Sequence, residues 1–298
     1  MIPPARVRRL LVRLAALVVA GAAVAPLVGA AVATAAAPAR RTYYLALGAS
    51  ESLGMQPVGP GGHVVPTDEG YADALVAMER SRWPGLQLVH VGCPGITSQA
   101  ALEGGGRCHF VAGSEVSAAV DFLRGHRGQT VLATVDLGFN DLWPCVAHGA
   151  VDQSCVTAAL GRISRTLPVI LRKLRAAGGH SMLIVGLLHN DPALAAYLQG
   201  PEGRAYSAGA LSAVNRLNAT LHDVYARAGV AVANVPSAFS LATSSPPAGA
   251  GALPADVVKV CGLSWMCSKG NIHLNAAGYA AVASAVAAAL PRAGDGAQ

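Results

Sequence analysis

Four residues of the types used in acyl transfer stand next to predicted strands and helices: Ser50, Gly95, Asn140 and His273. A serine hydroxyl becomes a strong nucleophile when a neighbouring base, usually histidine, takes its proton. Asn140 offers a neutral side-chain N–H to an oxyanion, and the backbone N–H groups of Gly95 and Ser50 are two further donors. We therefore predict a serine nucleophile, Ser50, with His273 as its base.

The elements that must position these residues alternate along the chain. Five short apolar runs predict strands at 43–47, 86–91, 130–137, 181–186 and 230–235. Helical spacing of apolar residues predicts helices at 70–80, 115–124, 155–177, 208–228 and 276–290. Such alternation is typical of a parallel sheet with helices on both faces.

Ligand sites in such sheets form beyond the carboxyl ends of the strands, near the point where the strand order reverses. Ser50 follows the first predicted strand, the loop 92–98 follows the second, and the loop 138–141 follows the third. These loops are neighbours if the first strand lies between the second and third. His273 precedes the last helix. We expect one site at this edge of the sheet.

The chain resembles the SGNH/GDSL hydrolase superfamily, and its secreted actinobacterial members, in four ordered blocks: Gly48-Ala49-Ser50, Gly92-Cys93-Pro94-Gly95, Gly138-Phe139-Asn140-Asp141, and Asn271-Ile272-His273. The resemblance covers roughly 43–290. It implies an α/β fold: a three-layer α/β/α sandwich, flavodoxin-like, with a five-stranded parallel sheet of order 2-1-3-4-5. It also implies an esterase or lipase that hydrolyses small-molecule or lipid esters without a metal or other cofactor.

Two positions depart from the family pattern. Ala49 stands where the family usually carries the Asp of Gly-Asp-Ser; Glu51 could replace it in part, but we expect its side chain to point elsewhere. Asn271 stands where an Asp usually orients the histidine; it can hold the ring but offers no charge, and a backbone carbonyl near Gly270 is the alternative orienting group. We therefore expect a Ser-His dyad or a weakened triad of weak to moderate activity.

Five polar or aromatic residues near these blocks receive secondary interpretations. Asp141 is interpreted as a carboxylate that braces its loop. Trp143 and Trp265 either line an acyl pocket or pack their loops. His189, before Asn-Asp-Pro, follows the fourth predicted strand and could reach the site, but we interpret it as part of a turn. Asn218 begins a glycosylation sequon inside a helical pattern and is interpreted as a chance match.

The six cysteines lie in three close pairs, Cys93–Cys108, Cys145–Cys155 and Cys261–Cys267. An even number of cysteines in an exported chain predicts disulfides, and proximity in the sequence favours these three local bonds. No Cys-x-x-Cys occurs, which argues against a zinc site.

Residues 1–37 have the features of a secretory signal peptide. Four arginines precede an uncharged run from Leu14 to Pro38 that ends in small residues, including Ala33-Thr34-Ala35. An uncleaved membrane anchor is the alternative, because the run is long enough to span a bilayer. We assign 38–298 to one hydrolase domain and expect a secreted or cell-envelope protein.

The charge of the chain argues against a protein whose main function is to bind nucleic acid. The net charge is +6, part of which lies in the export segment, and aromatic residues make up 5%. We expect a monomer without a nucleic-acid partner, and association with the membrane or cell envelope remains open. Two other functions remain open: a catalytically degenerate lipid- or glycan-binding protein, which Ala49 and Asn271 would favour, and a carbohydrate O-deacetylase.

Overall fold

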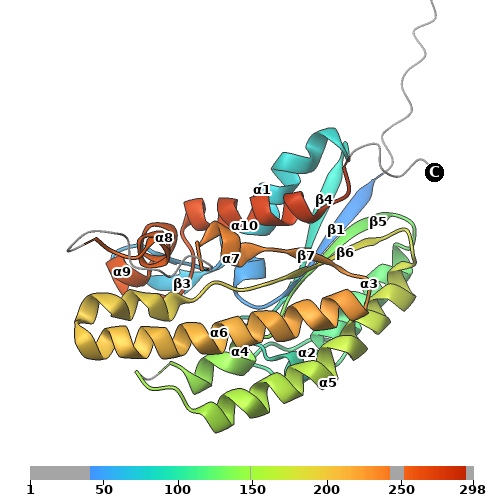
Figure 1. The fold of residues 1–298 in the computed structure, drawn as a ribbon. Coiled ribbons are helices and arrows are strands. Elements are labelled where there is room, and N and C mark those ends of the chain that lie inside the picture. The colour runs from blue at the N-terminus through green and yellow to red at the C-terminus, as the bar shows by residue number, and fades with distance from the viewer. Residues whose placement is uncertain (1–40, 148, 242–251, 293–298) are drawn as a thin grey trace, which may run out of the picture. The chain divides into compact units, whose positions relative to one another are not determined.

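Five parallel strands form the central sheet of the computed structural model, which describes residues 41–147, 149–241 and 252–292 (Figure 1). Their spatial order is β4-β1-β5-β6-β7. Their bounds are β1 (Thr42–Gly48), β4 (Leu86–Gly92), β5 (Thr130–Asp136), β6 (Leu183–Leu187) and β7 (Ala231–Ala233). The expected order 2-1-3-4-5 is confirmed. The predicted export segment, 1–37, lies outside the described residues.

Helices cover both faces of the sheet and give the three expected layers. α1 (Tyr71–Met78) and α10 (Ala276–Ala289) pack together on one face (Figure 1). α2 (Ser98–Glu103), α3 (Glu115–Gly125), α5 (Gln153–Gly178) and α6 (Pro201–Arg227) lie on the other. None of the helices in the described part of the chain combines the length and hydropathy that a membrane crossing requires.

Shorter elements connect these layers, most of them at the carboxyl edge of the sheet, and all but the one that overlaps the predicted helix 70–80 were not predicted. They are the 3₁₀ helices η1 (Glu51–Leu53), η2 (Glu79–Ser81), η3 (Trp143–Cys145) and η4 (Pro192–Gln199), the helices α4 (Phe139–Leu142), α7 (Val235–Ala238), α8 (Ala255–Leu263) and α9 (Met266–Lys269), and the hairpin of β2 (Gln56–Val58) and β3 (His63–Val65). Apart from η4 and α8, these elements have only three or four residues, too few for a periodic apolar pattern, so tertiary contacts decide them.

The strand that leads to Ser50 is buried on both faces. Tyr44, Leu45 and Leu47 are fully buried, as a continuous apolar run in a parallel sheet predicts. The Tyr44 hydroxyl lies 2.8 Å from Thr134 Oγ1 on β5, so even the polar atom of this core residue has a partner. A rigid β1 therefore presents the turn that follows it.

Among the helices that were predicted, the largest shift of a boundary is at the start of α6, which begins at Pro201 instead of 208. Proline is favoured at the first helical position because its missing N–H would have no intrahelical partner there. α5 begins at Gln153, ahead of the predicted 155, because the Asp152 carboxylate accepts the backbone N–H groups of Ser154 and Cys155.

All three predicted disulfides are present: Cys93–Cys108, Cys145–Cys155 and Cys261–Cys267. The first joins the loop after β4 to the segment between α2 and α3. The second joins η3 to α5, and the third joins α8 to α9, just ahead of His273. Each bond closes a loop that belongs to the carboxyl edge of the sheet.

Candidate active site

The nucleophile turn begins where β1 ends. Gly48 has φ +152°, and a Cβ there would lie 2.5 Å from the Asp136 carbonyl oxygen, so only glycine fits. The Ala49 N–H donates to that same carbonyl at 3.1 Å, and the Ser50 carbonyl accepts the N–H groups of Leu53 and Met55. Ser50 is half-buried, and its hydroxyl has no hydrogen bond to any described residue. The turn is fixed by its backbone, and its hydroxyl is available.

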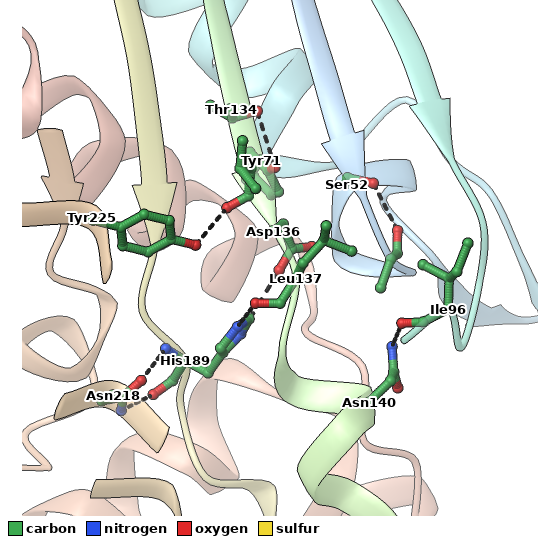
Figure 2. Close-up of polar contacts among 12 residues, drawn as sticks. Ser52, Tyr71, Ile96, Thr134, Asp136, Leu137, Asn140, His189, Asn218 and Tyr225 are labelled. Atoms are coloured by element: carbon green, nitrogen blue, oxygen red, sulfur yellow. Dashed lines mark hydrogen bonds and ion pairs between the residues drawn. The ribbon is translucent and has the colours of Figure 1, made fainter. Parts of the chain in front are cut away.

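The loop after β4 and helix α4 each bring one N–H donor to the same edge. The Cys93 N–H donates to the Gly48 carbonyl at 3.0 Å, which ties this loop to the end of β1. Gly95 has φ +76°, a conformation suited to glycine, and its N–H donates to no described residue. Asn140, in α4, donates one amide hydrogen from Nδ2 to the Ile96 carbonyl at 3.2 Å (Figure 2). Its second amide hydrogen is available for an oxyanion.

Asn271 fixes the orientation and tautomer of His273. The backbone N–H of His273 donates to Asn271 Oδ1 at 3.0 Å, so the atom that faces His273 must be the amide oxygen. The same oxygen lies 2.8 Å from His273 Nδ1, which must therefore carry the ring hydrogen and donate it. Burial lowers the pKa of His273 to about 4. The neutral ring thus keeps its lone pair on Nε2, where a base needs it.

Ser50, Asn140 and His273 line one small cavity of about 20 Å³. Gly95 is outside this lining, next to Ile96, whose carbonyl holds Asn140. Among the described residues no hydrogen bond joins Gly270 to the His273 ring; Gly270 caps α9 with φ +60° and lines a second cavity of about 430 Å³. The structure thus brings together the three side chains predicted for the reaction, and it places Asn271 rather than Gly270 against the histidine.

The secondary residues mostly brace loops. Asp141 accepts the Ser98 N–H at 2.7 Å and the Ser98 hydroxyl at 2.9 Å, which joins α4 to α2. Trp265 donates from Nε1 to Gln56 Oε1 at 3.2 Å and so packs its loop. Trp143 lines the 430 Å³ cavity, as an acyl pocket would require.

The expectation that the Glu51 side chain points elsewhere was wrong, and for His189 the structure agrees with the alternative, a position at the site, instead of the turn that we favoured. Glu51 lines the site cavity together with Asp136 and His189, instead of pointing elsewhere. His189 is 3% exposed, and its Nε2 lies 3.2 Å from the Leu137 carbonyl oxygen (Figure 2). The Asn-Asp-Pro that follows does begin η4, but the preceding histidine turns inward and packs beside Phe139.

Asn218 explains the inward position of His189. Its Oδ1 accepts the His189 N–H at 2.8 Å, and its Nδ2 donates to the His189 carbonyl at 2.9 Å (Figure 2). The buried Asn218 amide therefore has a structural role, which is consistent with the interpretation of the sequon as a chance match.

Asp136 was missed altogether. It is the last residue of β5 and is 2% exposed, with Oδ1 at 3.7 Å from His189 Nδ1. Burial raises the pKa values of both Asp136 and Glu51. For Glu51, repulsion from Asp136 raises the pKa further. For Asp136, hydrogen bonding by the N–H groups of Ser52 and Ala49 opposes the rise in pKa. Burial lowers the pKa of His189 to about 4, so its ring is neutral. A carboxylate at the end of an otherwise apolar strand was the available signal.

The model of the GDSL-like Lipase/Acylhydrolase family matches residues 46–281. The fold is similar to phospholipase A1 from Streptomyces albidoflavus NA297, at 17% identity and TM-score 0.53 over 84% of this chain and 100% of that one. It is also similar to the extracellular lipase from Streptomyces rimosus, at 18% identity and TM-score 0.51 over 84% and 100%. At these identities the likeness shows the fold. No curated protein matched the chain.

Proposed function

Because the chain belongs to the GDSL-like lipase/acylhydrolase family, we propose that this hydrolase is an exported serine esterase or lipase that acts on carboxylic esters. One observation carries the proposal: Asn271 holds His273 as a neutral ring with a free Nε2, in the cavity that Ser50 and Asn140 also line. Export is supported by the three disulfides, which persist in oxidising compartments.

The reaction begins when Ser50 Oγ attacks the ester carbonyl carbon and His273 Nε2 accepts the hydroxyl proton. The carbonyl oxygen gains negative charge, which the N–H groups of Ser50 and Gly95 and the free amide hydrogen of Asn140 stabilise. His273 then gives its proton to the departing alcohol oxygen. Water attacks the acyl-serine by the same route and releases the carboxylic acid.

With Asn271 as its third member, the proposed triad orients the His273 ring but has no negatively charged group beside it. The Asn271 amide oxygen selects the productive tautomer, which is one of the two tasks of the acid in a Ser-His-Asp triad. It supplies no negative charge to the imidazolium that forms during the reaction. The proposed enzyme is therefore slower than one with a carboxylate at this position, but functional.

At Ala49, hydrogen bonds of the backbone with β5 and Ser52 hold the nucleophile turn in place. The Asp136 carbonyl accepts the Ala49 N–H, and the Ser52 hydroxyl donates to the Ala49 carbonyl at 2.7 Å. Both polar groups of the Ala49 backbone are thus satisfied without an acidic side chain at this position. The turn keeps its shape, so the loss of the usual Asp does not by itself disable Ser50.

The acyl group is proposed to occupy the 430 Å³ cavity beside the site. Trp143, Leu198 and Met266 contribute to its lining, together with alanines of η4. Such a wall excludes water from an acyl chain, and the size falls within the range of small-molecule sites.

The test uses a fluorophosphonate probe and p-nitrophenyl esters. The wild-type protein should be labelled at Ser50 and should hydrolyse the ester, and Ser50→Ala should lose both properties. Ser284→Ala, an exposed serine on α10, is the matched control and should keep both. Equal rates for wild type and Ser50→Ala would overturn the proposal, and absent labelling would favour a binding protein without activated serine.

A further inference from the structure

We propose that Glu51, Asp136 and His189 bind a divalent transition-metal ion beneath the nucleophile turn. One carboxylate oxygen from each acid and one ring nitrogen of His189 all lie within 4.8 Å of one another. Figure 2 shows Asp136 and His189 side by side at the ends of β5 and β6. The inference concerns a site beside the proposed catalytic residues and does not depend on the ester substrate.

The tautomer of His189 leaves a lone pair aimed at the acids. The Leu137 carbonyl can only accept a hydrogen bond, so His189 Nε2, 3.2 Å away, must carry the ring hydrogen. In the neutral ring Nδ1 then has no hydrogen, yet it lies 3.7 Å from Asp136 Oδ1, another acceptor. Metal-binding histidines commonly donate their other N–H to a backbone carbonyl in this way.

An unpartnered oxygen of Asp136 is an independent sign of a missing ligand. Asp136 is 2% exposed, and its Oδ2 has no hydrogen-bond partner among the described residues. Neither Asp136 nor Glu51 forms an ion pair with a lysine or arginine in the described ranges. A buried carboxylate charge that only backbone N–H groups stabilise is costly, and a cation beside Asp136 would lower that cost.

The donor set selects the class of ion. One imidazole nitrogen and two carboxylate oxygens suit Zn²⁺ or Mn²⁺, whereas Ca²⁺ and Mg²⁺ prefer oxygen ligands alone. Three ligands at about 2.0–2.2 Å from one metal lie roughly 3.3–3.8 Å apart in a tetrahedral or trigonal arrangement. Asp136 Oδ1 and His189 Nδ1 already lie 3.7 Å apart, and the full spread of up to 4.8 Å would close by up to about 1 Å on binding.

Such an ion would join three loops of the active site. Glu51 belongs to the turn after Ser50, Asp136 ends β5, and His189 follows β6. The ion would hold the nucleophile turn through acids that neighbour Ala49, the position where the resembling family usually carries its own Asp. It would position Ser50 without touching the ester.

Titration of the tag-free, chelator-treated protein with MnCl₂ tests the site. Bound Mn²⁺ is followed by electron paramagnetic resonance. The titration is then repeated with ZnCl₂, CaCl₂ and MgCl₂. We expect one Mn²⁺ per chain and preference over Ca²⁺ and Mg²⁺. Asp136→Asn and His189→Gln should each weaken binding by more than about a hundredfold, because losing an outer-shell partner alone costs roughly 10–100-fold. Ser50→Ala, and His222→Gln at an exposed histidine, should bind as the wild type does.

Binding that survives both ligand substitutions would overturn the proposal, as would no binding of Mn²⁺ or Zn²⁺ by a folded wild-type protein; a shared proton would then satisfy the acids. If the ligand variants fail to fold, ¹⁵N spectra of the wild type decide: Zn²⁺ should shift His189 Nδ1 while Nε2 stays protonated. An unchanged Nδ1 resonance would refute the site. These measurements do not use esterase activity, so they can succeed or fail separately from the proposed function.

Discussion

Replacing Asn271 with aspartate should make the enzyme faster and change its pH profile. Asn271 Oδ1 lies 2.8 Å from His273 Nδ1, and the pKa of His273 is lowered to about 4 by burial. A carboxylate at this distance raises the pKa of an imidazole by about 1–3 units, to roughly 5–7. A shift of one pKa unit corresponds to about 1.36 kcal/mol of extra stabilisation of the protonated ring over the neutral ring. If the proton is about half transferred in the transition state, about half of this free energy lowers the barrier.

The expected gain for Asn271→Asp is therefore about 0.7–2 kcal/mol of transition-state stabilisation, or roughly 3- to 30-fold in kcat. It is smaller than the ~10⁴-fold known for acid-to-amide changes that select the wrong tautomer, because Asn271 already selects the right one. Neutral His273 is the active form, so activity is lost as pH falls through its pKa. The acid limb of kcat/KM should move from about pH 4 to roughly pH 5–7.

The assay is p-nitrophenyl ester hydrolysis from pH 3 to 9 on three variants. Asn271→Ala, which removes the orienting oxygen, should fall below the wild type. Asn234→Asp adds the same charge at the N-cap of α7, where aspartate is equally suited, and should leave rate and profile unchanged. If Asn271→Asp gives no gain and an unmoved acid limb, the orientation of His273 by Asn271 is refuted.

Three further substitutions test the remaining supports of the site. Asn140→Ala should lower kcat by about 10²–10³ with little change in KM, since an oxyanion donor acts in the transition state; an equal rise in KM instead would indicate a role in ground-state binding. Asp141→Ala should lower the free energy of unfolding in urea by about 3 kcal/mol, because the buried Ser98 N–H and hydroxyl lose their acceptor, and a change below the error of the measurement would contradict the bracing role. The double variant Cys93→Ala and Cys108→Ala should cost about 3 kcal/mol, as expected for a closed loop with a sequence separation of 15; an unchanged urea midpoint would contradict this.

The sheet and its order could be predicted from the sequence because buried parallel strands read as continuous apolar runs. The segment around Leu45 and Leu47 is such a run, and Gly48 after it marks the turn. The disulfides were equally accessible, since each cysteine lies close to its partner in the chain. These features depend on local patterns, which the sequence contains.

The contacts beneath Ser50 could not be predicted, because they depend on how separate loops meet. Nothing near Asp136 in the sequence indicates that its carboxylate approaches Glu51 and His189. The inward turn of His189 depends on Asn218, on a different helix, which binds its backbone in both directions. The tautomer of His273 likewise required knowing which atom of Asn271 faces it.

The two departures from the family pattern have different physical consequences, and they can be separated by experiment. At Asn271 an amide keeps the geometry and removes a charge, so the effect is electrostatic and acts on the pKa of His273. At Ala49 the backbone contacts are kept, and acids from neighbouring positions, Glu51 and Asp136, gather below the turn. Asn271→Asp should therefore shift the pH profile without altering cation affinity. Asp136→Asn should weaken cation binding by more than about a hundredfold without moving the acid limb set by His273. A variant that changed both properties together would show that the acids below Ser50 and the histidine beside it act as one electrostatic unit.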